Sequence, residues 1–404
     1  MTNSFITASI IAKESLFQLR NNVVFLNLVH RDYKKEFVKV GDTISIRKPV
    51  KFESNDGAVL VKQSVQEGTT PFVIQNRKHI GWGFLTSDLT LTVADYAERY
   101  LNPAGIKLGN DVDVSLAQLY KQLWLSAGTP GTTPASFSAL GDLATIMDDN
   151  AIPDDGKRRL VFNPAARWSM ADALKGVYDN SMPKDFIRRG MLGKIANFMI
   201  YGNQNIIRHR CGALVDTGIL TDGVSQTSNS TPQANSMLLH MDTFGADTAN
   251  ALRAGDVFTI ADVYAVNPVS KQSTGQLMQF TVLADFTPVS GEGDVTIAPA
   301  IVTTGPYQNV DSVPADSAPC TFMGSDNAYF AQNMGFHKNA LGCVMVPLAL
   351  PDGCNFKARI QDEGVSIRVL KQFSIIDDED IIRLDIMWGT KAIYPDLGAR
   401  QWAA

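Results

Sequence analysis

The sequence is poor in cysteine and in long apolar runs. Its 404 residues include four cysteines, with no CxxC pair, at positions 211, 320, 343 and 354. Metal ligation by cysteine and disulfide frameworks both need a denser pattern, so we expect buried, reduced thiols made in a cytoplasm. No apolar run approaches the roughly 18 residues of a membrane span. The N-terminus also lacks the basic and apolar regions of a secretory signal.

Signatures of catalytic, cofactor and metal sites are missing as well. The glycines of GTPGTTP (128–134) are not followed by the GK[ST] of a phosphate-binding loop, and neither GxSxG nor HExxH occurs. The acidic run Asp377–Asp380 lacks the spacers and glycine of a calcium loop and indicates a solvated turn between strands. The five histidines are scattered, at positions 30, 79, 209, 240 and 337. A His–Asp–Ser triad can still form by folding, because its geometry defines it. We nevertheless expect no catalytic, cofactor-binding or metal-ligating residues and no cofactor.

Basic side chains are scarce in one long stretch, which marks a domain boundary. Residues 212–332 contain two basic and twelve acidic side chains, a net charge of −10. Residues 221–235 have a linker composition. Three β-branched runs separated by turn residues follow, at 257–266, 278–284 and 294–302. This pattern predicts a β-rich inserted domain, either a small antiparallel barrel or a sandwich.

A second stretch has the opposite charge. Residues 157–210 hold eleven basic side chains against three acidic ones, with clusters at Lys157–Arg159, Arg188–Arg189 and Arg208–Arg210. Two interpretations stay open. The segment is either a basic face that is solvated or pairs with acids of neighbouring subunits, or a surface that contacts phosphate backbones without reading sequence.

The rest of the chain mixes helices and strands. Residues 7–20 predict an amphipathic helix and 41–50 a strand, while the polar stretch 51–84 resembles an extended hairpin. The spacing of Leu116, Leu119, Tyr120, Leu123 and Trp124 predicts a helix over 112–125.

Two later segments are equally regular. Residues 159–180 predict a strand followed by a helix, which Asn163 caps and Pro164 begins. In 380–388, apolar residues alternate with Arg383 and Asp385, as in a strand with one buried face.

Segments spread along nearly the whole chain resemble the tailed-phage coat proteins of the P22 type, which have the HK97 capsid fold. The C-terminal likeness lies in FHKNALGCVMVPLALP (336–351) and in 365–401, with Arg383-Leu384-Asp385, Trp388-Gly389 and Pro395. Other segments agree in order: HRDYKKEF (30–37), SIRKPV (45–50), FLTSDLTLTVADYAERY (84–100), GTPGTTP, FNPAARWSMADALKG (162–176) and, for the inserted domain, 254–280. The likeness weakens over 185–211.

The resemblance implies an α+β capsid fold in five parts. These are an N-arm (1–40), an extended loop that lies over a neighbouring subunit (41–88), a peripheral domain with a spine helix (89–128 and 375–404), an axial domain (129–211 and 333–374) and an inserted β-barrel domain (212–332).

The expected function is therefore that of a major capsid protein, which is structural and not enzymatic. It would assemble into the hexamers and pentamers of an icosahedral shell around double-stranded DNA. The implied partners are other copies of itself, scaffolding protein, portal and packaged DNA, with no membrane. The implied location is the virion, after synthesis in a bacterial cytoplasm. Some phage capsids cross-link a loop lysine to an asparagine, and Lys62 and Lys78 are the lysines considered, but the P22 type does not cross-link. A carbohydrate-binding or tail-associated virion protein, or a hydrolase, are the alternatives.

Overall fold

The computed structural model describes most of the chain. It covers residues 8–31, 43–60, 62–63, 67–85, 97–174, 193–223, 226–227, 235–354, 356–362, 364–374 and 379–404. Contacts divide the chain into two compact units. Unit 1 comprises residues 1–45, 71–117 and 342–391, and unit 2 comprises 46–70, 118–341 and 392–404. Among the described helices, none is long and apolar enough to cross a membrane.

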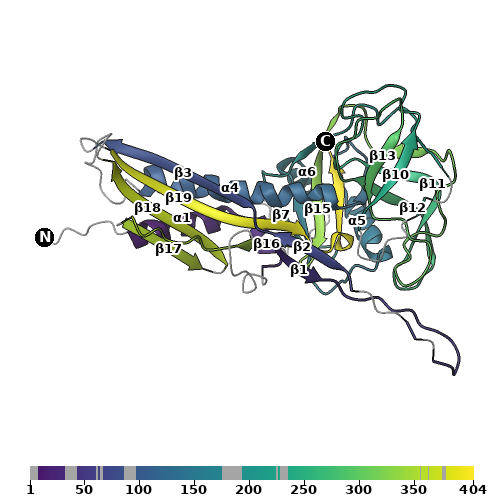
Figure 1. The fold of residues 1–404 in the computed structure, drawn as a ribbon, viewed down its shortest axis with the longest axis horizontal. Coiled ribbons are helices and arrows are strands. Elements are labelled where there is room, and N and C mark those ends of the chain that lie inside the picture. The colour runs from purple at the N-terminus through teal and green to yellow at the C-terminus, as the bar shows by residue number, and fades with distance from the viewer. Residues whose placement is uncertain are drawn as a thin grey trace. The chain divides into compact units, whose positions relative to one another are not determined.

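The sheet of unit 1 is built around one long strand, β19 (Glu379–Ala392). The other strands are β3 (Asn76–Leu85), β16 (Leu341–Met345), β17 (Phe356–Asp362) and β18 (Val365–Ser374). β19 pairs with β3 along one edge and with β18 and β16 along the other, and β17 lies outside β18. Figure 1 shows β3 running beside β19 for most of its length. The predicted strand 380–388 is confirmed.

The alternation in β19 buries a carboxylate as well as apolar side chains. Ile382, Leu384, Ile386 and Trp388 are buried, as predicted. Asp385 on the other face is also fully buried, because Arg368 donates to it at 2.7 and 3.2 Å and Arg383 at 2.9 Å. A buried carboxylate is tolerated when hydrogen-bonded cations surround it.

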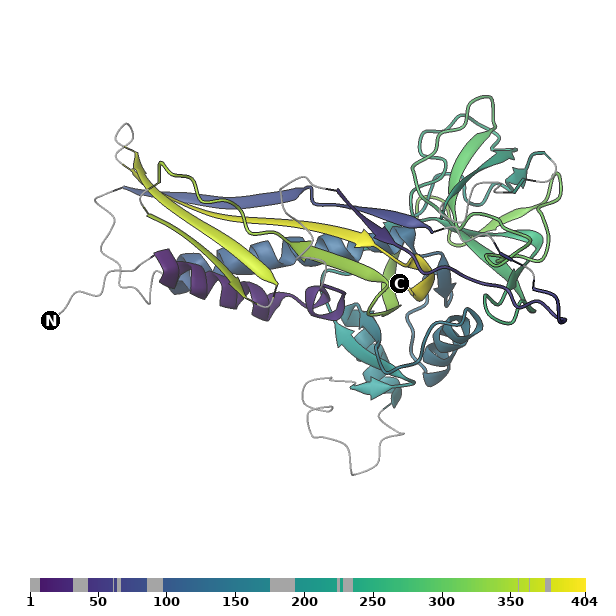
Figure 2. The ribbon, with the colours of Figure 1, turned by 60° about the horizontal axis from the view of Figure 1, so that its bottom comes forward.

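Helices α1 (Ala8–Asn22) and α4 (Asn102–Ala117) lie side by side against this sheet (Figure 2). Their close approach depends on glycine. A Cβ at Gly105 would lie 3.0 Å from the carbonyl oxygen of Ser15, and one at Gly109 would lie 3.3 Å from that of Leu19. The predicted helix 7–20 corresponds to α1.

The predicted limits of the spine helix, 112–125, are wrong. The α-helix begins at Asn102, after the π-helix η3 (Ala97–Leu101), and ends at Ala117, where the 3-10 helix η4 (Gln118–Gln122) follows. Pro103 and the two glycines of α4 hid its first half from the periodicity. Pro103 is accommodated in the first turn, where its missing N–H is not needed. The predicted stripe is nevertheless buried: Leu116, Leu119, Tyr120, Leu123 and Trp124.

A carboxylate of α4 also organises the short helix α2 (Phe25–Leu28). The side chain of Asp113 is fully buried and accepts hydrogen bonds from the backbone N–H groups of Val24 (2.9 Å) and Phe25 (3.1 Å). These are first-turn donors without partners inside the helix. Asp113 thus acts as a cap supplied from a distant part of the chain.

The predicted hairpin 51–84 is also corrected. Strands β1 (Thr43–Arg47) and β2 (Thr69–Val73) form a two-stranded sheet, and residues 48–68 are the loop between them. The following run, Asn76–Leu85, does not belong to the hairpin, because β3 pairs with β19 over ten residue pairs. We use the name extended loop for residues 48–68 below.

The larger sheet of unit 2 has seven strands. They are β4 (Leu125–Ala127), β5 (Arg158–Phe162), β6 (Lys194–Ile195), β7 (Phe198–Gly202), β8 (Arg208–Arg210), β15 (Tyr329–His337) and β20 (Gly398–Ala403). Their order is β4-β20-β15-β5-β7-β6, and β8 also pairs with β15. The 3-10 helix η5 (Pro395–Leu397) precedes β20.

Two capped helices accompany this sheet. In α6 (Pro164–Leu174), the side chain of Asn163 accepts from the backbone N–H of Ala166 at 2.8 Å, which confirms the predicted cap. In α5 (Phe137–Asp149), Ser136 accepts from Ala139 N–H at 3.3 Å. Capping of this kind stabilises a helix by about 1 kcal/mol.

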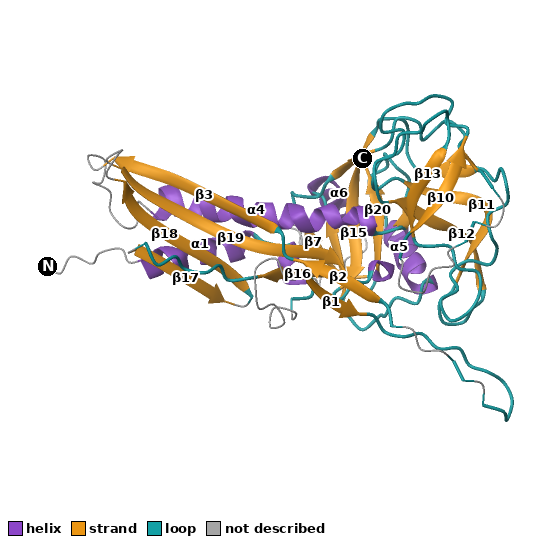
Figure 3. Ribbon diagram, in the orientation of Figure 1, coloured by secondary structure: helices purple, strands orange, loops and turns teal. Residues whose placement is uncertain are grey.

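The insert is a six-stranded antiparallel sheet whose edges meet. Its strands are β9 (Leu220–Thr221), β10 (Met237–Asp242), β11 (Val257–Val266), β12 (Ser273–Val282), β13 (Gly293–Ala298) and β14 (Cys320–Phe322), in the order β14-β11-β12-β13-β10-β9. The N–H of Cys320 donates to Ile219 O and that of Thr221 to Ala318 O, so β9 also adjoins the start of β14. The sheet is therefore barrel-like. Figure 3 shows strands and long loops in this part of the chain.

The boundaries of the insert differ slightly from the predicted 212–332. The predicted end falls inside β15, whose first residues pair with β8: Tyr329 lies opposite Arg210 and Ala331 opposite Arg208. The two host strands thus lie next to each other where the insert leaves and returns, a geometry that favours domain insertion.

The C-terminal residues are also assigned differently. The prediction grouped 375–404 with the peripheral domain, but residues 392–404 belong to unit 2. The physical reason is strand pairing, because β20 lies between β4 and β15 and hydrogen-bonds with both.

The glycines of α4 give a first prediction. Gly105→Ala should lower stability by about 1–3 kcal/mol, because the added methyl meets backbone atoms that cannot move freely. Gly141→Ala in α5 is the matched control, since nothing lies within 4 Å of its Cβ position. That change should stabilise by up to about 1 kcal/mol, because alanine favours the helix. Urea denaturation followed by far-UV circular dichroism measures both. Equal stabilisation by the two substitutions would contradict the close approach of α1 and α4.

Candidate functional site

A buried polar cluster joins the insert to the sheet of unit 2. The Tyr120 hydroxyl lies 2.9 Å from His209 Nδ1, and His209 Nε2 lies 2.8 Å from Asp256 Oδ1. Asp256 also accepts hydrogen bonds from the backbone N–H groups of Arg253 (2.6 Å) and Gly212 (3.1 Å). Tyr120 comes from η4, His209 from β8 and Asp256 from the turn before β11. We call this set, with Arg400, the junction.

Arg400 supplies the positive charge of the junction. Its guanidinium donates to Gly255 O at 2.7 Å and to Thr281 Oγ1 at 3.0 Å, and it lies 5.7 Å from the ring centres of Tyr120 and Trp402. Burial lowers the pKa of Arg400 to about 10, so the group stays charged at neutral pH. Cation–π contacts and a buried carboxylate nearby offset part of the desolvation.

The hydrogen bonds fix the protonation of His209. An ionised Asp256 can only accept, so His209 Nε2 carries the hydrogen and Nδ1 accepts from the Tyr120 hydroxyl. Burial lowers the pKa of His209, although the bond to Asp256 acts in the opposite direction. The neutral imidazole therefore connects a hydroxyl to a carboxylate.

This order of groups is also found in hydrolases, but here it is closed to substrates. Tyr120 and His209 are each 2% exposed and Asp256 is fully buried. A nucleophile must reach its substrate for the triad logic to apply. The junction is therefore a structural connection between the insert and the sheet. Sequence reasoning noted His209 but had no signal that linked it to Asp256.

The extended loop has both internal contacts and exposed apolar side chains. Lys48 Nζ lies 2.7 Å from Asn235 Oδ1, and the backbone N–H of Lys51 donates to the Tyr307 hydroxyl at 3.2 Å. These contacts connect the base of the loop to the insert. Beyond them, residues 51–60 are all exposed. They include Phe52, Val59 and Leu60, which are 67%, 82% and 81% exposed.

The two lysines considered for cross-linking are placed differently from each other. Lys62 is exposed on the extended loop. Lys78 is not on that loop: it lies on β3, and its Nζ is 3.0 Å from Asp111 Oδ1. The prediction that both belong to the loop is wrong, because β3 pairs with β19.

The basic segment 157–210 is only partly a surface. Arg158 is 1% exposed and its guanidinium binds Asp148 and the carbonyls of Ile152 and Pro153, so it is not free to meet DNA. Arg208 and Arg210 are exposed, on either side of the buried His209. Arg188 and Arg189 lie outside the described residues.

The cysteines and the acidic run follow the prediction where they are described. All four cysteines are free and buried. Burial raises the pKa of the Cys211 thiol to about 12. Asp377 and Asp378 lie outside the described residues. Asp380 is on β19 and pairs with Lys371 at 2.8 Å.

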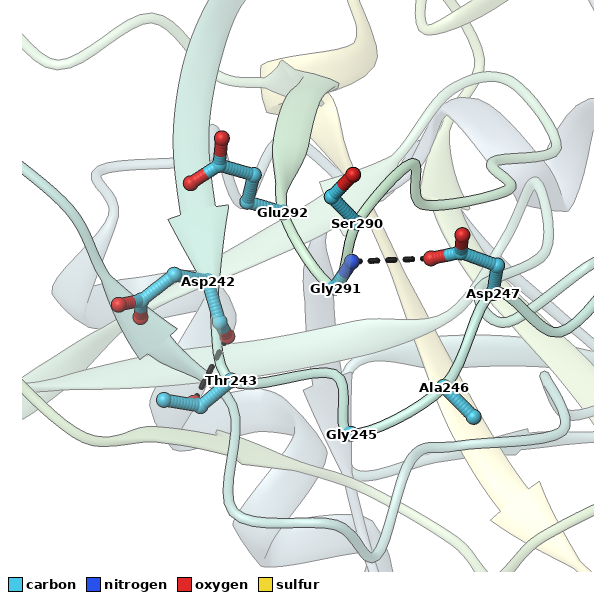
Figure 4. A pocket seen from close by; sticks show the side chains of 8 residues that line it. All are labelled: Asp242, Thr243, Gly245, Ala246, Asp247, Ser290, Gly291 and Glu292. Atoms are coloured by element: carbon cyan, nitrogen blue, oxygen red, sulfur yellow. Dashed lines mark hydrogen bonds between the residues drawn. The ribbon is translucent and has the colours of Figure 1, made fainter.

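An open pocket of about 530 Å³ lies on the insert (Figure 4). Its lining comes from the end of β10 and from the turn before β13, and comprises Asp242, Thr243, Gly245, Ala246, Asp247, Ser290, Gly291 and Glu292. Asp247 accepts from the backbone N–H of Gly291 at 2.9 Å, which holds the two sides together. The lining is polar and acidic.

Comparison with known proteins identifies the family. The family model described as P22 coat protein, gene protein 5, matches residues 9–401. The chain belongs to the P22 coat protein family. It is accordingly a major capsid protein, a structural subunit of the shell of a tailed bacteriophage, and its place is in the virion. No curated protein sequence matches it.

Solved structures similar to this coat subunit come from phage capsids. The capsid of cyanophage P-SCSP1u is 12% identical, with 95% of this chain and 88% of that chain covered and a TM-score of 0.47. A chain of Mycobacterium phage Che8 is 12% identical, with 94% and 90% covered and a TM-score of 0.46. The CUS-3 coat protein I-domain is 30% identical over 27% of this chain and 97% of that chain, with a TM-score of 0.20. The family assignment rests on the match over residues 9–401.

The junction gives the second prediction. Asp256→Ala should destabilise the coat subunit by about 3–5 kcal/mol, because it leaves a buried cation without its partner. Asp285→Ala is the matched control, since Asp285 is exposed and accepts one hydrogen bond, from Ala254 N–H. That loss should amount to about 0.5–1.5 kcal/mol. Urea midpoints of the unassembled subunits measure the difference. Similar midpoints for the two variants would show that the junction does not hold the insert.

Proposed function

We propose that the coat subunit forms hexamers and pentamers in which the extended loop lies over a neighbouring subunit. The exposure of Phe52, Val59 and Leu60 supports this proposal more than any other observation. Loops of a soluble protein are usually polar at their tips, and apolar side chains in contact with water favour burial against a partner. In the shell, the partner is another copy of the same chain.

The contacts at the base of the loop support the same role. The bonds from Lys48 to Asn235 and from Lys51 to Tyr307 restrict the direction in which the loop leaves its own subunit. Ordering a loop before it binds reduces the entropy lost on association. A loop prepared in this way would favour one orientation of the neighbouring subunit.

A shell of this kind needs many repeated contacts of modest strength. Symmetric closure repeats the same heterologous interfaces over the whole particle. Interfaces that are separately strong would trap incomplete or wrongly closed particles. A single polar loop with a few apolar side chains fits this requirement.

The third prediction concerns the extended loop. The double change Val59→Ser and Leu60→Ser should leave the subunit folded but reduce assembly at least about tenfold, because each buried apolar side chain contributes about 1.5–3 kcal/mol and 1.4 kcal/mol corresponds to a factor of ten. Val269→Ser is the control, since Val269 is 79% exposed on the insert. Sedimentation velocity and electron microscopy count the shells. Wild-type shell yields from the double variant would refute the role of the loop.

Packaged double-stranded DNA is a further proposed partner. The exposed Arg208 and Arg210 belong to the basic segment and supply charge that is not used to hold Asp148, as Arg158 is. Contact with phosphates would be independent of sequence and would weaken steeply with salt. We also propose contact with scaffolding protein and portal, which copurification with assembling shells would detect, and synthesis in a bacterial cytoplasm, which the free thiols suit.

The fourth prediction tests the DNA contact. Arg208→Ala should lower the affinity of the subunit for duplex DNA and reduce the slope of log affinity against log salt by about 0.9 for each phosphate that the subunit no longer neutralises. Lys107→Ala is the control, because Lys107 is exposed on α4 and pairs with Asp111. Fluorescence anisotropy with labelled DNA at several salt concentrations measures both. An unchanged salt slope for Arg208→Ala would exclude this residue from the contact.

A further inference from the structure

The outer face of the insert carries a row of ionisable side chains across three adjacent chain segments. His240 lies on β10, directly opposite Asp294 on β13. On the other side of β10, the backbone N–H of Asp222 donates to His240 O at 3.1 Å. Leu239 and Met241, the neighbours of His240 in sequence, are fully buried, so His240 points to the outside of the barrel-like sheet.

The side chains of this row are within bonding reach of one another. His240 Nδ1 lies 2.8 Å from Asp294 Oδ1, and His240 Nε2 lies 3.4 Å from Asp222 Oδ2. Glu292 lies two residues before Asp294 and so projects to the same face. The ligand atoms of Asp222, His240 and Glu292 all lie within 4.8 Å of one another.

Asp294 gives the imidazole the orientation that a metal ligand needs. Its carboxylate accepts from Nδ1–H, so in the neutral ring the lone pair is on Nε2, which faces Asp222. A carboxylate that holds the distal N–H of a histidine is the usual outer partner of a metal-bound imidazole. This bond is independent of the acidic cluster itself and points to Nε2 as a ligand.

A second observation comes from the adjoining pocket. Asp242, two residues after His240, has a buried Oδ1 with no hydrogen-bond partner among the described residues. Figure 4 shows Asp242 and Glu292 on the pocket wall. Burial raises the pKa of Asp242, and the negative charge of Asp222 adds to this effect. The face thus gathers carboxylates that a cation would stabilise.

The donor set selects the type of cation. One imidazole nitrogen with carboxylate oxygens suits zinc and its neighbours, whereas calcium and magnesium prefer oxygen alone. In a tetrahedral zinc site with bonds near 2.1 Å, ligand atoms lie about 3.4 Å apart. Partly exposed side chains on strand edges and turns can close from 4.8 Å to that separation by rotamer changes.

We propose that Asp222, His240 and Glu292 form a binding site for a divalent transition metal, best matched by zinc, with Asp294 as the residue that orients His240. The sequence analysis expected no metal site, because these residues are 70 positions apart and follow no ligand motif. Metal bound here would link β9, β10 and the turn before β13, and it would reduce the negative charge of the insert. This proposal does not depend on the role of the extended loop.

Zinc titration of the chelator-treated, unassembled full chain by isothermal calorimetry tests the site. The wild type should bind one zinc ion per chain, and His240→Gln should weaken binding at least tenfold. Asp294→Asn should weaken it by about 10–100-fold, because it removes the outer partner of the ligand. His79→Gln and Asp262→Asn are matched controls at exposed positions, and both should bind as the wild type does. Asparagine suits position 262, where φ is 60°.

The outcomes separate clearly. Circular dichroism and urea midpoints of His240→Gln confirm that the fold is retained, and Co²⁺ added in place of zinc should give the visible absorption of a tetrahedral site in the wild type only. Absence of binding to the wild type at millimolar zinc would overturn the proposal. So would unchanged binding by His240→Gln. The buried group His209, Cys211 and Asp256 is the other set with ligand spacing among the described residues. Loss of zinc in Cys211→Ser but not in His240→Gln would place the metal there and refute the site on the outer face.

Discussion

The attachment of the insert depends on one buried carboxylate. Asp256 is fully buried, and it accepts hydrogen bonds from His209 and from two backbone N–H groups while Arg400 supplies the balancing charge. Burying an unpaired charge is prohibitive, so these groups must assemble together or not at all. The chain order reinforces this: β8 and β15 bracket the insert and β20 contributes Arg400, so the junction forms only after distant strands have paired. The insert is thereby held in a defined position on the sheet.

The same constraint connects the insert to shell assembly. The apolar core of unit 2 is continuous from sheet residues such as Leu160 and Phe162 to insert residues such as Phe258 and Phe280. The insert also contacts the base of the extended loop through Asn235 and Tyr307. A subunit whose insert is fixed by the junction therefore presents its loop in a restricted direction. Charge has a separate effect, because the acidic insert discourages association before assembly.

Unit 1 shows how buried polar groups specify a register. Asp385 sits opposite Arg368 on β18, and a shift of one residue would move its carboxylate to the other face of the sheet, away from the arginines. Asp113 similarly fixes α2 by capping its N-terminus. Both groups stabilise a single arrangement because any alternative leaves a buried charge without partners.

Local patterns in the sequence determined the elements whose signals are themselves local. The alternation in β19, the Asn163 cap of α6, the β-rich insert and the burial of Leu116 to Trp124 all follow from periods of two or 3.6 residues or from one capping side chain. Tertiary structure alone decided the features that depend on pairing across long distances. Gly105 and Gly109 looked like helix breakers, yet they lie inside α4, because a neighbouring helix needs the space. Lys78 looked like part of a loop until β3 paired with β19. Arg158 looked like a surface cation, but Asp148 and two carbonyls bury it. His209 with Asp256, and His240 with Asp294, are 47 and 54 residues apart and meet only across the folded chain. No local spacing encodes such contacts, because they are fixed by which strands pair and in which register.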